Sequence, residues 1–253
     1  MITENNARRI ANSLSDTSSK GYGKIIEYAY LLKIFDEEIL TGRTTCSECE
    51  EFRYLFYDFF AMDSRAYKPV VNAFFALFDD LVANVNNWEM DYVLNKLSSI
   101  LGRVETSYAS KMVHMFDHTF AIWDSVLTEH FRNEGYTDIK NSSYQLPLNE
   151  RIESAFETYC YYASMFEGYV HDAIDILPGH INGSDVIRIF NSTIPTNPIP
   201  INGTNDVLNF DLSDVKKVDF ILWLDRENLP KISFHTEARE ILKARFPDYN
   251  FGR

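Results

Sequence analysis

Apolar residues recur every three or four positions along most of the chain from Tyr22 to Leu177, a spacing that places them on one face of an α-helix. The boundaries carry helix signals as well. Ser47 to Glu50, "SECE", resembles a capping box, Asp124 and Asn149 suit N-caps, and Pro178-Gly179 follows the last run. The fold class that follows is mainly α, a multi-helix globular domain. The expected helices are Tyr22–Leu40, Glu50–Met62, Ala66–Val85, Glu89–Leu101, Ser107–Phe116, Ser125–Phe131 and Glu150–Leu177.

The composition changes after Leu177, where "LPGHINGSDVIRIFNSTIPTNPIPINGT" is rich in proline and turn residues. We therefore expect a helical main domain over residues 1–177, and over residues 178–253 a Pro/Gly-rich connection with a small C-terminal region. In that region the apolar run "VDFILWL", Val218–Leu224, fits a short strand or a buried helix, and Thr236–Phe246 fits a helix.

The formal net charge of −13 predicts a protein that repels other polyanions at long range. Hydrophobic residues make up 45% of the chain, which is enough to build a core without a metal or disulfides. The start of the chain is polar and lacks the apolar stretch of a signal peptide, and no apolar run reaches the length of a membrane helix. We expect a cytoplasmic protein with no membrane partner. The residues expected in the core include Leu31, Phe56, Phe74, Leu97, Val113, Ile122 and Phe156.

Possible ligand sites for metals and cofactors are incomplete. Cys46 and Cys49 have the spacing of half a zinc site, but no second pair of ligands matches them. His114 and His118 are four residues apart without the glutamate of an H-E-x-x-H motif. Gly21-Tyr22-Gly23 lacks the further glycines of a phosphate loop. We expect no metal, no disulfide and no cofactor.

The segment "ASKMVHMFDHTFAIWDSV", Ala109–Val126, allows two interpretations. In one, Lys111 is an exposed helical lysine and Asp124 is only an N-cap, which accepts hydrogen bonds from the free amides at the start of a helix. In the other, the Lys111 amine is desolvated until its pKa falls. It then acts as a nucleophile toward a sugar C1′ atom, and Asp124 stabilises positive charge at that carbon.

The longer segment "SYASKMVHMFDHTFAIWDSVL" is similar to bacterial proteins of the form S-x-A-(S/T)-K, an apolar turn, then P-I-(Y/W)-D-S. In outline it resembles the helix-hairpin-helix DNA glycosylase superfamily, whose lysine follows the hairpin and whose catalytic aspartate opens a later helix. By this resemblance Lys111 matches the lysine and Asp124 the aspartate. Gly102 is the one hairpin glycine that is kept, and Ala121 stands where the motif has proline.

The resemblance implies a DNA glycosylase-like protein, or a degenerate descendant of one, that removes a modified base from DNA in DNA repair. Lys111 and Asp124 would then be catalytic, and Tyr108, His114 and Trp123 would bind the substrate. The alternative is a non-catalytic, acidic helical module, phage or defence related, whose partner is another protein. The sequence leaves open whether the protein is an enzyme.

Overall fold

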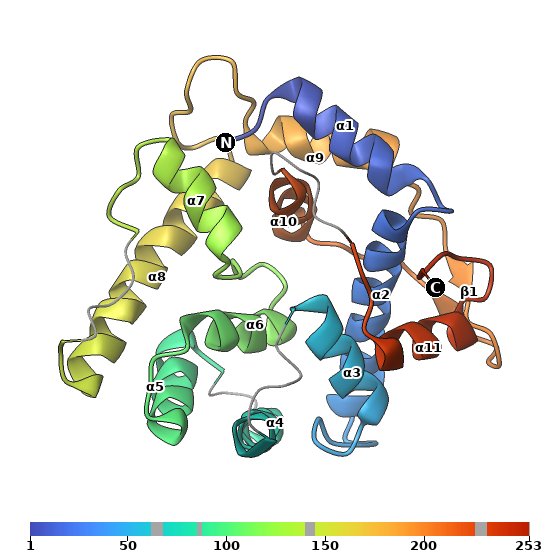
Figure 1. The fold of residues 1–253 in the computed structure, drawn as a ribbon, viewed down its shortest axis with the longest axis horizontal. Coiled ribbons are helices and arrows are strands. Elements are labelled where there is room, and N and C mark those ends of the chain that lie inside the picture. Colours follow the sequence, from blue (N-terminus) through green and yellow to red (C-terminus); the bar gives the residue numbers. More distant parts are fainter. Residues whose placement is uncertain (62–67, 85–87, 140–144, 226–231, 253) are drawn as a thin grey trace. The chain divides into compact units, whose positions relative to one another are not determined.

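The computed structural model describes residues 1–61, 68–84, 88–139, 145–225 and 232–252. Within them the chain forms eleven α-helices, one π-helical turn and two short strands (Figure 1). The predicted mainly α fold class is therefore confirmed. In this part of the chain, no helix has both the length and the apolar character needed to cross a membrane.

The chain folds into two compact units, each assembled from three segments. Unit 1 comprises Met1–Ala7, Ala83–Ile189 and Ser213–Asp225, and unit 2 comprises Arg8–Val82, Phe190–Leu212 and Arg226–Arg253. The boundary expected from composition, at residue 177, divides the sequence into two consecutive segments. Each structural unit instead combines residues from before and after that position.

In unit 1, α5 packs against α6, both helices contact α8, and α10 packs on α7 and α8. Gly102 ends α5 in a left-handed conformation (φ 67°), which glycine adopts without a steric penalty. Aromatic side chains fill the space between α7 and α8, where the Phe131 ring lies 5.7 Å from that of Tyr162. The helices are α5 (Met90–Leu101), α6 (Thr106–Phe116), α7 (Ser125–Asn133), α8 (Leu148–Val170) and α10 (Asp214–Leu224).

In unit 2, α2 packs against α3, α11 packs on α3, and α2 runs on into the π-helical turn η1. The two strands pair antiparallel, with Ile199 opposite Leu208. A cluster of buried phenylalanines joins α3 and α4, and the Phe56 ring lies 5.6 Å from that of Phe74. The elements are α2 (Lys20–Ile34), η1 (Phe35–Ile39), α3 (Glu50–Phe59), α4 (Lys68–Ala83), β1 (Ile199–Pro200), β2 (Val207–Leu208) and α11 (Thr236–Arg245).

Two helices lie outside the expected set, α1 (Glu4–Ser15) and α9 (Gly183–Thr193). Both have a short buried stripe on an otherwise polar helix, such as Ile10 and Leu14 in α1. The run Val218–Leu224, which fitted a strand or a helix, is helical within α10. The expected C-terminal helix is α11.

Several expected helix ends need correction. The helix expected to reach Leu177 ends at Val170, and its N-cap position is Pro147 in place of Asn149. The N-cap of α3 is Cys49, because the Ser47 side chain donates to Asp79 instead of capping the helix. The expected ends at Met62, Ala66 and Val85 lie outside the described residues.

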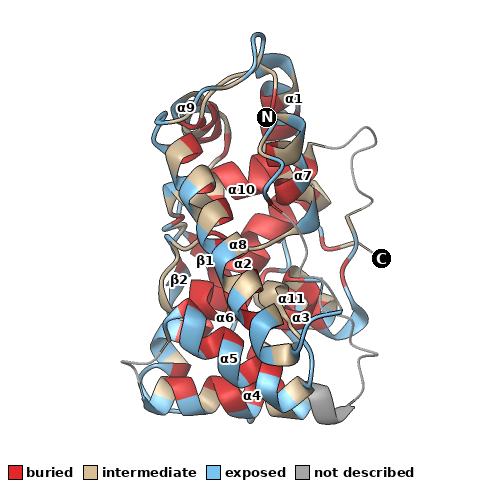
Figure 2. Cartoon of the chain, turned by 90° about the vertical axis from the view of Figure 1, so that its left-hand side faces the viewer, coloured by how far each residue is buried: buried red, intermediate tan, exposed pale blue. Residues whose placement is uncertain are grey.

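Buried residues lie on one side of most helices and exposed residues on the other (Figure 2). Six of the seven expected core residues are buried, namely Leu31, Phe56, Phe74, Leu97, Val113 and Ile122. Phe156 is only half-buried. It sits beside the buried stripe of α8, which contains Ile152, Ala155 and Tyr159, so its ring reaches the edge of the core.

Candidate functional site

The candidate site lies in unit 1, where the second turn of α6 contributes Lys111. Helical spacing puts His114 on the same face of the helix, and both side chains are buried, with Lys111 7% exposed and His114 fully enclosed. A lysine is seldom buried to this extent without charged neighbours. The site therefore depends on what surrounds the Lys111 amine.

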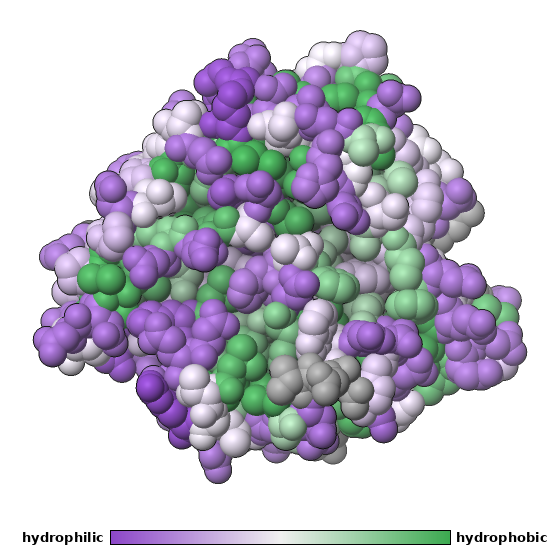
Figure 3. Space-filling model, turned by 180° about the vertical axis from the view of Figure 1, so that it is seen from behind, coloured by the Kyte–Doolittle hydropathy of each residue, from purple (hydrophilic) through white to green (hydrophobic). Residues whose placement is uncertain are grey.

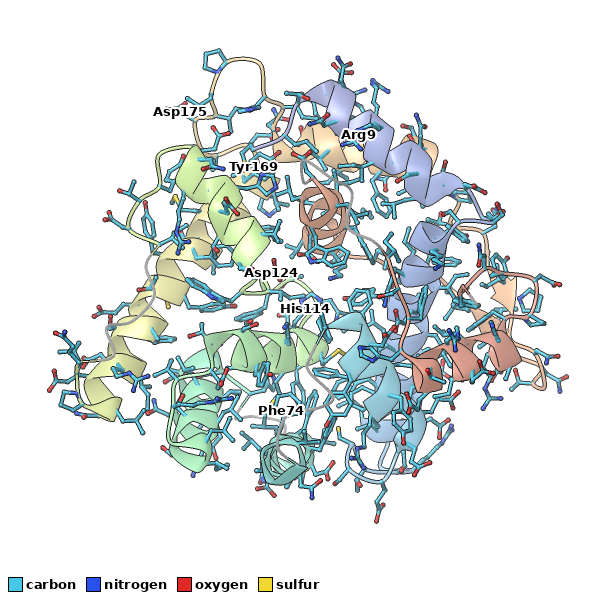
Figure 4. The ribbon with its side chains drawn as sticks, viewed as in Figure 1. Arg9, Phe74, His114, Asp124, Tyr169 and Asp175 are labelled. Carbon is cyan, nitrogen blue, oxygen red and sulfur yellow. The ribbon has the colours of Figure 1, made fainter. Side chains whose placement is uncertain are left out.

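Asp124 is the N-cap of α7, as expected from the sequence. Its side chain accepts a hydrogen bond of 2.7 Å from the Val126 amide. This bond fixes the carboxylate at the positive end of the helix dipole. Asp124 is half-buried at the start of α7, and His114 lies on α6 in the same unit (Figure 4).

Hydrogen bonds that involve side chains of α6 and α8 hold the loop between α6 and α7 in place. The Trp123 amide donates to the Ser110 hydroxyl at 2.9 Å, and His114 Nδ1 bonds the Phe120 carbonyl at 2.8 Å. From α8, the hydroxyls of Tyr159 and Tyr162 donate to the carbonyls of Ala121 and Ile122, both at 2.8 Å. These bonds fix the backbone that leads into Asp124.

Burial lowers the pKa of the Lys111 ammonium to about 8, from an ordinary value of 10.5. The Asp124 carboxylate is the strongest opposing influence, while Lys216 lowers the pKa further and Asp219 raises it. The Lys111 amine thus lies within electrostatic reach of three carboxylates, those of Asp124, Asp219 and Glu105, and of a second lysine. At neutral pH about one-tenth of such an amine is unprotonated, about 300 times more than for a free lysine.

The second lysine and second carboxylate come from α10. Lys216 and Asp219 lie one helical turn apart, form an ion pair, and are both buried. Burial raises the pKa of the Asp219 carboxyl, and Lys216 opposes this shift. The sequence-based prediction of the site did not include Lys216 and Asp219. One local signal could have indicated them, namely a lysine and an aspartate three positions apart at the start of an apolar run.

The three residues expected to bind substrate occupy different environments. The Tyr108 ring is half-buried, and its centroid lies 5.8 Å from Lys111 Nζ. The Trp123 ring is half-buried and packs edge-on against Tyr162 at 5.2 Å. His114 lies in the core, where burial holds its pKa well below 6.5, and its Nδ1 is bonded to the loop. Tyr108 and Trp123 border the cluster, whereas His114 supports the loop from inside.

A cavity of about 500 Å³ is lined in part by the same loop. It has the size of a small-molecule site, and both apolar and polar residues line it. Neither Lys111 nor Asp124 lines it. Its lining residues are Thr119, Phe120, Ala121, Ala163, Phe166, Glu167, Val170, His171, Ser213, Asp214 and Val215.

The described residues contain no group of three or more His, Cys, Asp or Glu side chains that could hold a metal ion. The cysteine pair that resembled half a zinc site consists of a buried Cys46 and a half-buried Cys49, and both are free thiols.

No protein-family model, curated protein or solved structure matches the chain. The proposed function therefore rests on the residues of the site and on the resemblance carried by Ser107–Leu127.

Proposed function

We propose that Lys111 is a nucleophile and that the protein acts on a sugar carbon of DNA that carries a modified base. The observation that carries this proposal is the lowered pKa of the Lys111 amine beside the fixed carboxylate of Asp124. Perturbed lysines next to a specific charge partner are typical of catalytic sites. The free thiols Cys46 and Cys49 suit a reducing compartment, so we place this activity in the cytoplasm.

The proposed reaction begins when the unprotonated Lys111 amine attacks C1′ of the nucleotide. The C1′–N bond to the base breaks, its electron pair leaves with the base, and the base takes up the proton that the amine loses. The C1′–O4′ bond then opens as the nitrogen lone pair forms the C1′=N bond of an iminium, and the O4′ electron pair takes a proton from water. Asp124 stabilises the positive charge at C1′ throughout.

A modified base can reach a buried amine only after it leaves the duplex stack. Tyr108 and Trp123 are half-buried aromatic side chains next to Lys111 and Asp124. Aromatic faces of this kind stack on an extruded base. In this proposal the two rings hold the base while the amine reacts.

Reductive trapping tests the proposal, because cyanoborohydride converts the iminium to a stable amine bond. Duplexes with uracil, 8-oxoguanine or an abasic site are incubated with the protein, and the covalent complex is mapped by mass spectrometry. We expect one of the two base-containing duplexes to be trapped on Lys111. Lys111→Met should lower trapping by at least about 100-fold. The matched control is Lys96→Met, an exposed lysine of α5, which should trap normally.

The second candidate is a non-catalytic protein-interaction module. The net charge of −13 favours it, since an acidic surface repels DNA and attracts a basic protein partner. Among the described side chains seen in Figure 3, hydrophilic residues surround separate hydrophobic patches. This candidate predicts that no duplex is trapped and that Lys111→Met and the unchanged protein bind DNA equally weakly.

A further inference from the structure

The C-x-x-C motif formed by Cys46 and Cys49 lies in unit 2 and plays no part in the proposed function. The Thr45 carbonyl accepts hydrogen bonds from the amides of Glu48 at 3.2 Å and of Cys49 at 2.9 Å, so residues 45–49 form one helical turn. Side chains three positions apart in such a turn have Cβ atoms about 5–6 Å apart. A disulfide needs about 4 Å between its Cβ atoms, so a shift of about 1–2 Å in this turn is enough to join the two sulfurs.

The two thiols differ in how easily a solute reaches them. Cys49 is half-buried, occupies the N-cap position of α3, and lines a cavity of about 380 Å³ within unit 2. Cys46 is completely buried. A small molecule in the cavity therefore meets the Cys49 sulfur first, and Cys46 can react only with a group that is already attached to Cys49.

The start of α3 controls the ionisation of Cys49. Burial raises the pKa of the Cys49 thiol, the backbone amides of Phe52 and Glu51 lower it, and the carboxylates of Glu51 and Glu38 raise it again. The amides favour the thiolate because they lie at the positive end of the helix dipole. Since only the thiolate is nucleophilic, any reaction at Cys49 should become faster as the pH rises.

The carboxylate of Asp79, on α4, contacts the buried Cys46. The Cys46 thiol donates a hydrogen bond to Asp79. The Ser47 amide donates to both oxygens of the same carboxylate at 3.3 Å, and the Ser47 hydroxyl donates to one of them. Burial raises the pKa of Cys46 and also that of Asp79. A buried thiol that reacts must pass its proton to a nearby acceptor, and Asp79 is in position to take it.

We propose that Cys46 and Cys49 are a redox-active dithiol that exchanges with small disulfides. In the first step the Cys49 thiol loses its proton to water, and the thiolate attacks one sulfur of the small disulfide. The S–S bond of that molecule breaks. One half leaves as a thiolate and takes up a proton from water, and the other half remains bonded to Cys49 as a mixed disulfide.

In the second step Cys46 gives its proton to Asp79 and attacks the Cys49 sulfur. The mixed disulfide breaks, and the second half of the small molecule leaves as a thiol with the proton that Asp79 accepted. The Cys46 and Cys49 sulfurs are then joined. The protein dithiol is oxidised to a disulfide, and the small disulfide is reduced to two thiols. The resting protein holds both cysteines as free thiols.

Mass spectrometry of the thiols over time tests the proposal. The probe is 2-hydroxyethyl disulfide, which is uncharged, and the protein is Cys160→Ser, which lacks the exposed thiol of α8. We expect a disulfide between Cys46 and Cys49 as the product, with only a transient adduct on Cys49. In Cys46→Ala the adduct should accumulate. In Cys49→Ala the rate of thiol loss should fall at least about tenfold, because Cys46 is buried.

Asp79→Asn separates proton transfer from a purely structural role. Asparagine has nearly the same shape but accepts no proton, so the adduct on Cys49 should last at least about tenfold longer at neutral pH. This difference should shrink at high pH, where hydroxide removes the Cys46 proton. Asp80→Asn, at the exposed next position of α4, is the matched control and should close at the normal rate. The proposal is overturned if the adduct never converts to the Cys46–Cys49 disulfide, or if Asp79→Asn closes as fast as Asp80→Asn.

Discussion

The Nζ atom of Lys24 on α2 lies 2.7 Å from Oδ2 of Asp58 on α3, and both side chains are almost completely buried. Glu27, one turn further along α2, accepts from the same ammonium group at 2.7 Å. The amide of His235, next to α11, donates to the other Asp58 oxygen at 2.6 Å. Burial holds the pKa of Glu27 well above 4.5, so this cluster is a tightly coupled group of charges inside unit 2.

Removing the cation from this cluster should destabilise the protein strongly. Lys24→Met leaves two carboxylates in a buried site without their ammonium partner, and we expect a loss of about 3–5 kcal/mol in the free energy of unfolding. Urea denaturation followed by circular dichroism measures this loss. Arg43→Gln is the control, because its ion pair with Glu38 is exposed and should contribute at most about 1 kcal/mol. A similarly small loss for Lys24→Met would show that the cluster does not stabilise unit 2.

The tyrosines of α8 that hold the loop before Asp124 give a second prediction. Tyr162→Phe removes the hydroxyl that donates to the Ile122 carbonyl and leaves that carbonyl without this donor. We expect a loss of about 1–3 kcal/mol in the free energy of unfolding. Tyr161→Phe, at the half-buried neighbouring position, should change it by no more than about 0.5 kcal/mol. Equal effects of the two variants would contradict the role assigned to Tyr162.

The lowered pKa of Lys111 predicts a pH dependence of stability. The folded protein releases the Lys111 proton near pH 8, while the unfolded chain keeps it until about pH 10.5. Between these values the unfolded state binds more protons, so the contribution of Lys111 becomes more favourable as the pH rises. The cost of burying the charged amine is fully present below pH 8 and amounts to about 3 kcal/mol.

Comparison with Lys111→Met isolates this contribution, because most other titrating groups cancel in the difference. The free energy of unfolding of the unchanged protein, minus that of Lys111→Met, should rise by about 3 kcal/mol from pH 7 to pH 10.5. The same difference for Lys96→Met should stay flat. A flat difference for Lys111→Met as well would mean that the Lys111 amine titrates normally in the folded protein.

The spacing of apolar residues is sufficient to predict helices that have one buried and one exposed face, such as α5 and α7. It is insufficient for Val218–Leu224, because five of these seven residues are buried apolar residues and the run lacks an exposed face. In α1 the apolar residues have helical spacing, but they are few among polar neighbours. The apolar stripe is therefore too short to predict this helix from the sequence.

The candidate site is only partly predictable for a different reason. Asp124 can be recognised as an N-cap because the signal is local, with a short polar residue directly before a helical run. The approach of Lys216 and Asp219 to Lys111 depends on how α10 packs in unit 1, and no local pattern specifies it. The burial of His114 is likewise a tertiary effect, since its neighbours in sequence do not distinguish a core histidine from a ligand.

The proposed role of Asp124 gives a fourth prediction. Asp124→Asn should keep the cap of α7, because asparagine caps a helix about as well as aspartate, and should change the free energy of unfolding by less than about 1 kcal/mol. It should lower the rate of trapping by about 100-fold or more, since the negative charge at C1′ is lost. A large loss of stability with unchanged trapping would indicate that Asp124 acts only as a helix cap.

The rate of reductive trapping as a function of pH tests the role of Lys111 most directly. The trapped peptide is identified by mass spectrometry at each pH, so that the rate is assigned to one lysine. We predict a single modified residue, Lys111, and a rate that rises with pH to a plateau with a midpoint of about 8, where the amine loses its proton. Trapping on exposed lysines such as Lys96, a midpoint near 10.5, or no trapped complex with any base-containing duplex would contradict the account.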